Sequence, residues 1–384
     1  MTILNNSEIE NTTLNYDVCI IGSGMSGQLV STELIKKKVI LVESGSVDFK
    51  KDIQELNNHK SVGLEFRKDN INRIRQLGGS ANLWANQLML LSDNDFEKRN
   101  WIDYNCYNPL SYKELKKYYE RAITKVYKNK FKEIGNLVNF KRGCYSLFEN
   151  EFLKDNNLKF NNHFWPSKVE KFNYNSKFTR AIINSKNIDF LNSYTATDFE
   201  IDENLKKVTS IKFIFGKKEI VINANFFVLA CGAIENARLL LNNRSKSKLL
   251  ENHNIGKYFM EHPRVNLGEL QINKNLPLNF LFGVKHYNYS IRHSLSFSKN
   301  YLVNNELLNS YVFLDPKFDT NEELYFNEFI HALKIIFKNK KIPKYNFRNF
   351  KLKSFIEQIY FNIPAQISSN SLNNLIRIYF QITK

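Results

Sequence analysis

A chain of 384 residues, of which 43% are hydrophobic and 14% aromatic, has enough apolar material for a folded core and exceeds the usual length of one domain. This composition excludes a globally disordered protein and favours one large domain or two interleaved domains. The 55 Lys and Arg against 38 Asp and Glu give a net charge of +17. Because the basic residues are mostly Lys and are spread along the chain, they indicate compositional bias and predict no nucleic-acid partner.

The N-terminal residues 1–15 are polar and lack the basic start and apolar stretch of a signal peptide. No apolar run reaches the roughly 18 residues of a membrane span. We therefore expect a disordered N-terminus over residues 1–15, no membrane span and a cytoplasmic location. The four cysteines form no CxxC pair, so no metal site is predicted, and Cys19 and Cys231 are expected to be buried and reduced.

A βαβ unit with a glycine-rich turn is the first predicted element. The apolar run Val18–Ile21 predicts a buried parallel strand, a helix follows to about Lys37, and Val39–Val42 predicts a second strand. The turn between the first strand and the helix is GSGMSG, a GxGxxG motif made of Gly22, Ser23, Gly24, Met25, Ser26 and Gly27. In such a motif the first glycine permits the turn, the second lets a pyrophosphate approach the backbone and the third lets the helix pack on the strand. The free N–H groups at the start of the helix attract the phosphates.

Glu43 ends the second strand, at the distance of about 20 positions from the glycine turn that a dinucleotide site requires. A carboxylate there accepts hydrogen bonds from ribose hydroxyls and repels a 2′-phosphate, which argues against NADP. The sequence Glu43-Ser44-Gly45 favours FAD over NAD because many flavoproteins share this ending. Tyr16 to Gly45 is therefore predicted to hold the ADP half of an FAD.

Further elements follow in chain order. Ser111 with Glu114 three residues later forms a capping box, so Ser111–Val126 predicts a helix. Ile188–Phe215 alternates as strands around a polar turn at Asp202–Lys206, and Ile220–Ala230 predicts a strand that leads into a glycine turn and the helix Ala233–Leu241.

Three other segments contain residues suited to a site. The loop LGGSANLW, Leu77–Trp84, offers two glycines and small polar residues that can lie against a cofactor, or it is an ordinary surface turn. The segment LACGAIENARLLL, Leu229–Leu241, places small residues between a strand and a helix, which serves either a cofactor or simple packing. In NIGKYFMEHP, His262 invites a catalytic role, but a histidine that packs locally before a proline is the commoner case.

Taken together and in this order, IGSGMSG…VESG, LGGSANLW, WIDYNCYNPLSYKELKKYYERA, LACGAIENARLLL and NIGKYFMEHP resemble the glucose-methanol-choline (GMC) oxidoreductases. The likeness is greatest to bacterial members similar to sugar or polyol dehydrogenases, and it covers about residues 16 to 265. The resemblance implies a mixed α/β fold, with a Rossmann-like FAD-binding domain over 16–264 that contains a helical insertion at about 100–165. It also implies an antiparallel-sheet substrate domain over 265–384.

The resemblance implies that FAD takes a hydride at flavin N5 from the carbon of a sugar, polyol or other alcohol while a base removes the hydroxyl proton. It assigns the pyrophosphate to the glycines of the first turn, the ribose to Glu43, and adenine to the backbone of Ala196. The full set of residues expected to bind the cofactor is Gly22, Gly24, Met25, Ser26, Gly27, Glu43, Ser44, Gly78, Gly79, Ser80, Asn82, Trp84, Ala196, Ala230 and Gly232.

Two departures from the family pattern change the expectation. Some sugar-oxidising members attach the flavin to a histidine in the second loop, where this chain has Leu83, so noncovalent FAD is expected. The family's catalytic histidine lies in a closing C-terminal segment, and none of His286, His293 and His331 has that context. The catalytic residues are therefore left unassigned, and the substrate domain is expected to be incomplete.

Two alternatives to an active oxidoreductase of this family stay open. One is an inactive flavin-binding remnant, and the other is a different FAD enzyme such as a monooxygenase, for which the sequence contains no nicotinamide-binding motif. The substrate and the electron acceptor stay open.

Overall fold

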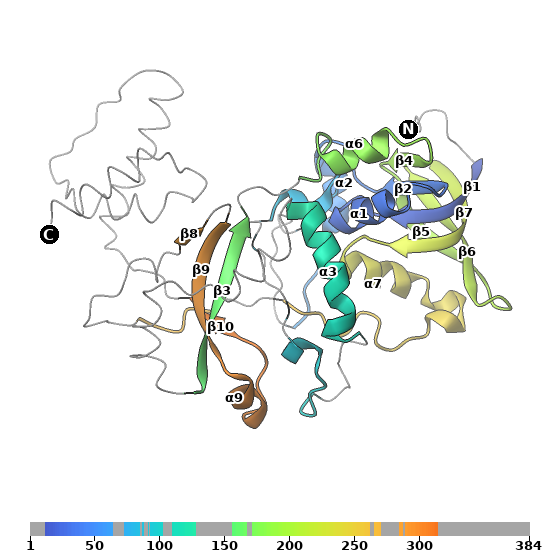
Figure 1. The fold of residues 1–384 in the computed structure, drawn as a ribbon. Helices are drawn as coiled ribbons and strands as arrows, with labels where there is room; N and C mark the ends of the chain where they lie inside the picture. Colours follow the sequence, from blue (N-terminus) through green and yellow to red (C-terminus); the bar gives the residue numbers. More distant parts are fainter. Residues whose placement is uncertain are drawn as a thin grey trace, which may run out of the picture. The chain divides into compact units, whose positions relative to one another are not determined.

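The computed structural model describes residues 12–63, 73–84, 87, 91, 93–102, 110–127, 156–166, 171–261, 265–269, 284–286 and 289–313. The chain divides into two compact units, the first made of Met1–Ala85 with Glu170–Gly268 and the second of Asn86–Val169 with Glu269–Lys384 (Figure 1). In the described part of the chain, no helix combines the length and the apolar character needed to cross a bilayer.

The first unit is built on a six-stranded sheet with the order β4-β2-β1-β7-β6-β5. Its strands are β1 (Thr12–Ile21), β2 (Val39–Glu43), β4 (Ile188–Asn192), β5 (Thr195–Asp202), β6 (Lys207–Phe215) and β7 (Lys218–Leu229). The strands β4, β2, β1 and β7 run parallel, whereas β6 and β5 are antiparallel to their neighbours. The parallel strands therefore bring the glycine turns after β1 and β7 and the acid at the end of β2 to one edge of the sheet, where α/β proteins bind ligands.

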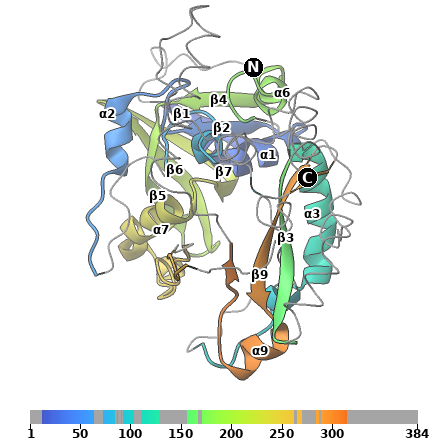
Figure 2. The ribbon, with the colours of Figure 1, turned by 90° about the vertical axis from the view of Figure 1, so that its left-hand side faces the viewer.

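Two apolar clusters cover the two faces of this sheet because successive side chains of a strand point to opposite sides. Ile20 and Leu41 pack on one face with the helices α1 (Met25–Glu33) and α6 (Lys177–Ile183), whereas Ile21 and Val42 pack on the other face with Leu239 of α7 (Ala233–Asn242). Figure 2 shows the sheet of the first unit between these helices. All five residues of β2 are buried, as expected of a central parallel strand.

Smaller elements complete the first unit. They are the helix α2 (Lys51–Gln54) and the 3₁₀ turns Glu55–Asn57, Gly79–Asn82, Arg244–Lys246 and Lys248–Leu250.

Strand β1 begins earlier than the sequence suggested. Thr12–Asn15 pair with Ile220–Asn223 of β7, so the expectation of a disordered N-terminus is wrong for residues 12–15. The sheet ladder supplies the order that the polar side chains do not. Residues 1–11 lie outside the described residues. Helix α1 is also shorter than expected, since it ends at Glu33 and Leu34 closes its last turn.

The second unit contains an antiparallel sheet, as the resemblance implied. Its strands are β3 (Leu158–Pro166), β8 (Val284–His286), β9 (Tyr289–Phe297) and β10 (Tyr311–Val312), and β9 pairs with the other three. The same unit holds α3 (Tyr112–Tyr127), α9 (Lys299–Asn304) and the 3₁₀ turn Asp93–Phe96. Thus the fold class, a parallel α/β sheet and a separate antiparallel sheet, is confirmed. The domain boundaries stay a prediction, with the addition that β3, which falls in the expected insertion, pairs with β9.

The predicted capping box at α3 is present. The hydroxyl of Ser111 accepts from the backbone N–H of Glu114 at 3.2 Å, and the Glu114 carboxylate accepts from the Ser111 N–H at 2.8 Å. This reciprocal pair satisfies two of the N–H groups that the first turn of a helix leaves without a partner.

Candidate dinucleotide site

The turn after β1 requires glycine at its first and last positions for reasons within the protein. Gly22 has φ +101°, and a Cβ there would lie 2.5 Å from the carbonyl oxygen of Ala230. A Cβ at Gly27 would lie 1.9 Å from the carbonyl oxygen of Gly22. These two glycines let β1, α1 and the end of β7 approach one another closely.

Gly24 is different because nothing in the protein demands it. Its φ of −64° suits any residue, and a Cβ there would meet no protein atom within 4 Å. Gly24 nevertheless lines the pocket described below. The space in front of its backbone is therefore open in the way that a closely approaching ligand needs.

The second glycine loop lies directly on the first. The N–H of Gly78 donates to the carbonyl oxygen of Ser23 at 3.1 Å, and Gly24 and Gly78 form an isolated parallel bridge. A Cβ at Gly79 would lie 3.3 Å from Cα of Gly24. Two loops separated by about 50 residues in sequence therefore form one continuous backbone surface.

Glu43 is buried, and its carboxylate ties the end of β2 to the first turn. Oε2 accepts from the N–H and the hydroxyl of Ser23, each at 2.8 Å, while Oε1 accepts from the N–H of Gly45 at 2.7 Å. The Ser44 hydroxyl also donates to Oε1, over a long 3.4 Å. An ionised carboxylate has about four acceptor positions, so a ligand hydroxyl can bind here by taking the place of this long contact.

The turn after β7 forms the third wall. Gly232 has φ +83° and precedes α7, and a Cβ there would again meet no protein atom within 4 Å. Asn236 holds this turn from both sides, since its side chain accepts from the N–H of Cys231 at 3.0 Å and donates to the carbonyl of Leu229 at 3.2 Å. The turn is thereby kept open beside the start of the helix.

These walls enclose a pocket of about 520 Å³ within the first unit. Its lining includes most of the residues expected to bind the cofactor, namely Gly22, Gly24, Met25, Ser26, Glu43, Ser44, Gly79, Ser80, Trp84, Ala196, Ala230 and Gly232. Gly27, Gly78 and Asn82 are not part of the lining. Gly27 and Gly78 build the turns, and the Asn82 side chain donates to the carbonyl of Leu77 at 3.0 Å, so the expectation that Asn82 faces the cofactor does not fit its position.

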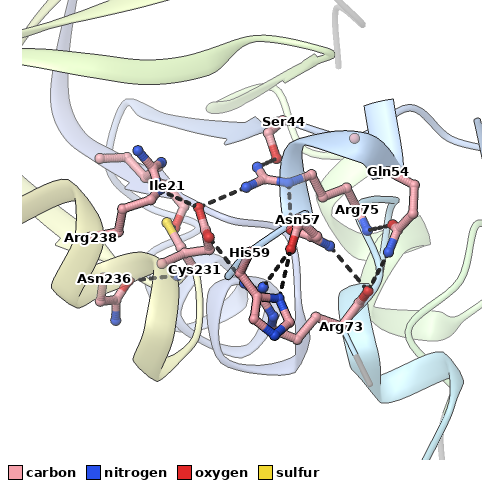
Figure 3. Close-up of polar contacts among 12 residues, drawn as sticks. Ile21, Ser44, Gln54, Asn57, His59, Arg73, Arg75, Cys231, Asn236 and Arg238 are labelled. Carbon is pink, nitrogen blue, oxygen red and sulfur yellow. Dashed lines mark hydrogen bonds and ion pairs between the residues drawn. The ribbon is translucent and has the colours of Figure 1, made fainter. Parts of the chain in front are cut away.

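An arginine cluster forms one wall of the pocket and was missed in the sequence. Glu235 of α7 pairs with three guanidinium groups: Arg73 at 3.0 Å on Oε1, and Arg75 at 2.7 Å and Arg238 at 2.9 Å on Oε2. Figure 3 labels the three arginines. Burial alone would raise the pKa of Glu235, but Arg75 and Arg238 together lower it, so this carboxyl is ionised. With three cations on one anion, the wall carries a net positive charge.

Other lining residues were not predicted from the sequence. Tyr194 and Thr195 directly precede Ala196 at the start of β5, and Cys231, Phe259 and Glu261 belong to segments in which the sequence pointed only to glycines or to a histidine. The segment Arg73-Ile74-Arg75, just before the second glycine loop, was the feature of the sequence from which an arginine cluster could have been predicted. Cys231 is half-buried and not fully buried as expected, and both Cys19 and Cys231 are free thiols.

None of the histidines considered for catalysis is among the described residues that line this site. His262 and His331 lie outside the described residues, and only the backbone of His286 is described. His293 is buried in β9 of the second unit, where its Nδ1 lies 2.7 Å from Oδ1 of Asn162. Among the described residues that line the pocket, none is a histidine.

No family model and no curated protein matches this chain. Solved structures similar to it include pyridoxine 4-oxidase from Mesorbium loti, at 18% identity over 59% of this chain and 51% of that chain, with a TM-score of 0.40. A formate oxidase of Aspergillus oryzae RIB40, studied for the effect of a mutation on FAD modification, is 14% identical over 61% of this chain and 48% of that one, with a TM-score of 0.41. A further formate oxidase structure is 16% identical over the same shares, with a TM-score of 0.40. This chain thus spans about half the length of these proteins. They are GMC oxidoreductases, the family whose motifs the sequence resembles.

Proposed function

We propose that the pocket binds FAD noncovalently and that the protein is a flavin-dependent oxidoreductase acting on a CH–OH group of a sugar, polyol or other alcohol. The observation that carries the proposal is the meeting of three glycine segments and Glu43 around one pocket. Gly24 supports it most directly, since a glycine that the protein itself does not need faces the open space of the pocket.

The residues present fit a dinucleotide. Free N–H groups at the start of α1, together with Gly79 and Ser80 of the second loop, suit a pyrophosphate. Glu43 suits the adenosine ribose, and the backbone at Ala196 suits adenine. In this proposal Leu83 replaces the histidine to which some GMC members attach their flavin, so the flavin is held without a covalent bond.

When bound, FAD supplies the hydride acceptor at N5, and the protein's own part is to bind and orient the cofactor and to provide a base for the hydroxyl proton. No residue is assigned as that base. The electron acceptor is equally unassigned, and a small-molecule substrate without a nucleic-acid partner stays part of the proposal.

A non-catalytic flavin-binding protein is the second candidate. It is favoured by one observation, the lack of a histidine among the described residues of the pocket wall. The two candidates share the cofactor and differ only in whether the bound flavin is reduced by an alcohol.

Two measurements test the proposal in sequence. The purified full chain is expected to show flavin absorbance that acid precipitation releases into the supernatant. A protein that neither retains nor takes up FAD overturns the cofactor assignment, and flavin that stays with the precipitate overturns noncovalent binding. Anaerobic mixing with a panel of sugars, polyols and simple alcohols then separates the candidates, because bleaching of the flavin supports the enzyme and an unchanged spectrum supports the non-catalytic protein.

A further inference from the structure

Arg75 is almost entirely enclosed by protein acceptors. Its side chain is 9% exposed, and each of its three guanidinium nitrogens donates to a different residue: Nε to Asn57 at 2.7 Å, one terminal nitrogen to the Ser44 hydroxyl at 2.8 Å and the other to Glu235 at 2.7 Å. Its backbone N–H donates to the side chain of Gln54 at 3.0 Å. Figure 3 shows the guanidinium group of Arg75 between Asn57 and Ser44. Arg75 is therefore suited to fixing its neighbours in place.

The contact with Ser44 determines the direction of the serine hydroxyl. A guanidinium group can only donate, so the Ser44 oxygen must accept from Arg75. The single proton of the hydroxyl is then directed elsewhere. It donates to Oε1 of Glu43 at 3.4 Å, a long and weak hydrogen bond that a closer ligand acceptor can replace.

Ser44 and Glu43 thus present a matched pair to the pocket that both of them line. Ser44 offers a donor, and Glu43 offers an acceptor beside it. A ribose hydroxyl is both a donor and an acceptor, so one such hydroxyl can donate to Glu43 and accept from Ser44. An ether or a phosphate at the same position has no proton for Glu43.

We propose that Ser44 is a binding residue for a free ribose hydroxyl of the dinucleotide and that Arg75, held by Glu235, is the positioning residue that orients its proton. The proposal rests on the function proposed above and adds to it the selection of an unmodified ribose. Arg73 and Arg238 support the arrangement by anchoring the Glu235 carboxylate on both oxygens.

The test uses the full chain and the ligands ADP, 2′-deoxy-ADP and 3′-deoxy-ADP, titrated by calorimetry at one salt concentration. The unaltered protein is expected to bind ADP about tenfold more tightly than one of the two deoxy analogues, as the loss of one hydrogen bond to a charged group implies. In Ser44→Ala this preference is expected to fall to about threefold, because the neutral hydrogen bond from Ser44 is lost while Glu43 still accepts from the ribose hydroxyl. Ser44→Thr, which keeps the hydroxyl, is expected to retain the full preference.

Arg75→Lys tests the positioning role separately. A lysine keeps the charge but cannot donate to Asn57, Ser44 and Glu235 in one planar arrangement, so the preference is expected to fall as in Ser44→Ala. Arg180→Lys makes the same chemical change at an exposed position of α6 and is expected to leave the preference at about tenfold. Glu235→Gln is a second test of the positioning role, because it weakens the ion pair that holds Arg75. Circular dichroism on every variant checks that the fold is intact.

A folded Ser44→Ala protein that still prefers ADP about tenfold overturns the role of Ser44. Folded Arg75→Lys and Glu235→Gln proteins that both keep the preference overturn the positioning role. An unaltered protein that binds neither FAD nor ADP contradicts the proposed function itself, which distinguishes that failure from the other two.

Discussion

The backbone N–H and the hydroxyl of Ser23 both donate to the same carboxylate oxygen of Glu43, each at 2.8 Å. Ser23 lies in the first glycine turn and Glu43 ends β2, so this pair fixes the two halves of the predicted ADP site relative to each other. A carboxylate in this position is therefore part of the fold as well as a candidate ligand for ribose.

Replacing Glu43 by Gln should weaken both roles. The amide keeps the shape, but its NH₂ group faces the N–H of either Ser23 or Gly45, which places two donors together. We expect a loss of about 2 kcal/mol in the free energy of unfolding, measured in urea, and at least tenfold weaker FAD binding. Glu219→Gln on β7 alters an exposed carboxylate paired with Lys212 and should change neither quantity. Unchanged stability in Glu43→Gln would contradict a structural role for the carboxylate.

The glycines of the first turn should separate folding from binding. In Gly27→Ala the new Cβ would lie 1.9 Å from a backbone oxygen that cannot move aside, so we expect a loss of about 3 kcal/mol or more in stability. In Gly24→Ala the methyl group meets no protein atom, so the melting temperature should stay within a few degrees while FAD binding is lost. Thermal melts and flavin retention on the same two proteins provide the measurement. Normal FAD binding by Gly24→Ala would place the cofactor elsewhere.

The two buried histidines of the second sheet should make its stability depend on pH. Burial, helped by the charge of Arg292, lowers the pKa of His163 to about 4, and burial together with His163 lowers that of His293 to about 4. Gln87 donates to Nδ1 of His163, so Nε2–H donates to Ser294 and the ring is held neutral. Because the folded state binds these protons less readily than the unfolded state, their stabilising effect is complete above about pH 6.5 and is lost as the pH falls toward 4.

Urea unfolding followed by tryptophan fluorescence at pH 7 and pH 5 measures this effect, with Trp165 reporting from β3. A downward pKa shift of this size corresponds to about 3 kcal/mol per group as an upper limit. The variants His163→Gln and His293→Gln should flatten the profile, whereas His59→Gln, at an exposed position of the first unit, should leave it unchanged. A flat profile in the unaltered protein would show that the two histidines become protonated without cost.

Cys231 should be a slow thiol despite lining the pocket. Burial raises its pKa to about 12, and the carboxylates of Glu43 and Glu235 act in the same direction. Since the thiolate is the reactive species, alkylation at pH 7.5 should be about a thousandfold slower than in the unfolded chain. Site-resolved mass spectrometry after iodoacetamide treatment measures the rate for this cysteine alone, and added FAD should slow it further. A rate near that of the unfolded chain would contradict a half-buried thiol that stays protonated at neutral pH.

The local part of the site could be predicted from the sequence. The strand, the GxGxxG turn, the helix and Glu43 lie within about 30 residues, and their geometry follows from glycine conformations and the alternation of apolar residues. For the same reason the capping box of Ser111 and Glu114 was identifiable, because both partners belong to one helical turn.

Only the tertiary structure decided the arginine cluster and the place of β3 in the second sheet. Arg75 and Glu235 are 160 positions apart, and β3 pairs with β9 across about 130 positions. Neither partner carries a local pattern that predicts the other, because both contacts join segments that lie far apart in the sequence and meet only in the folded chain. The sequence by itself thus determined a dinucleotide-type turn and its acid, through short-range backbone requirements. The folded chain decided which charges surround that turn, through hydrogen bonds that exist only after distant segments meet.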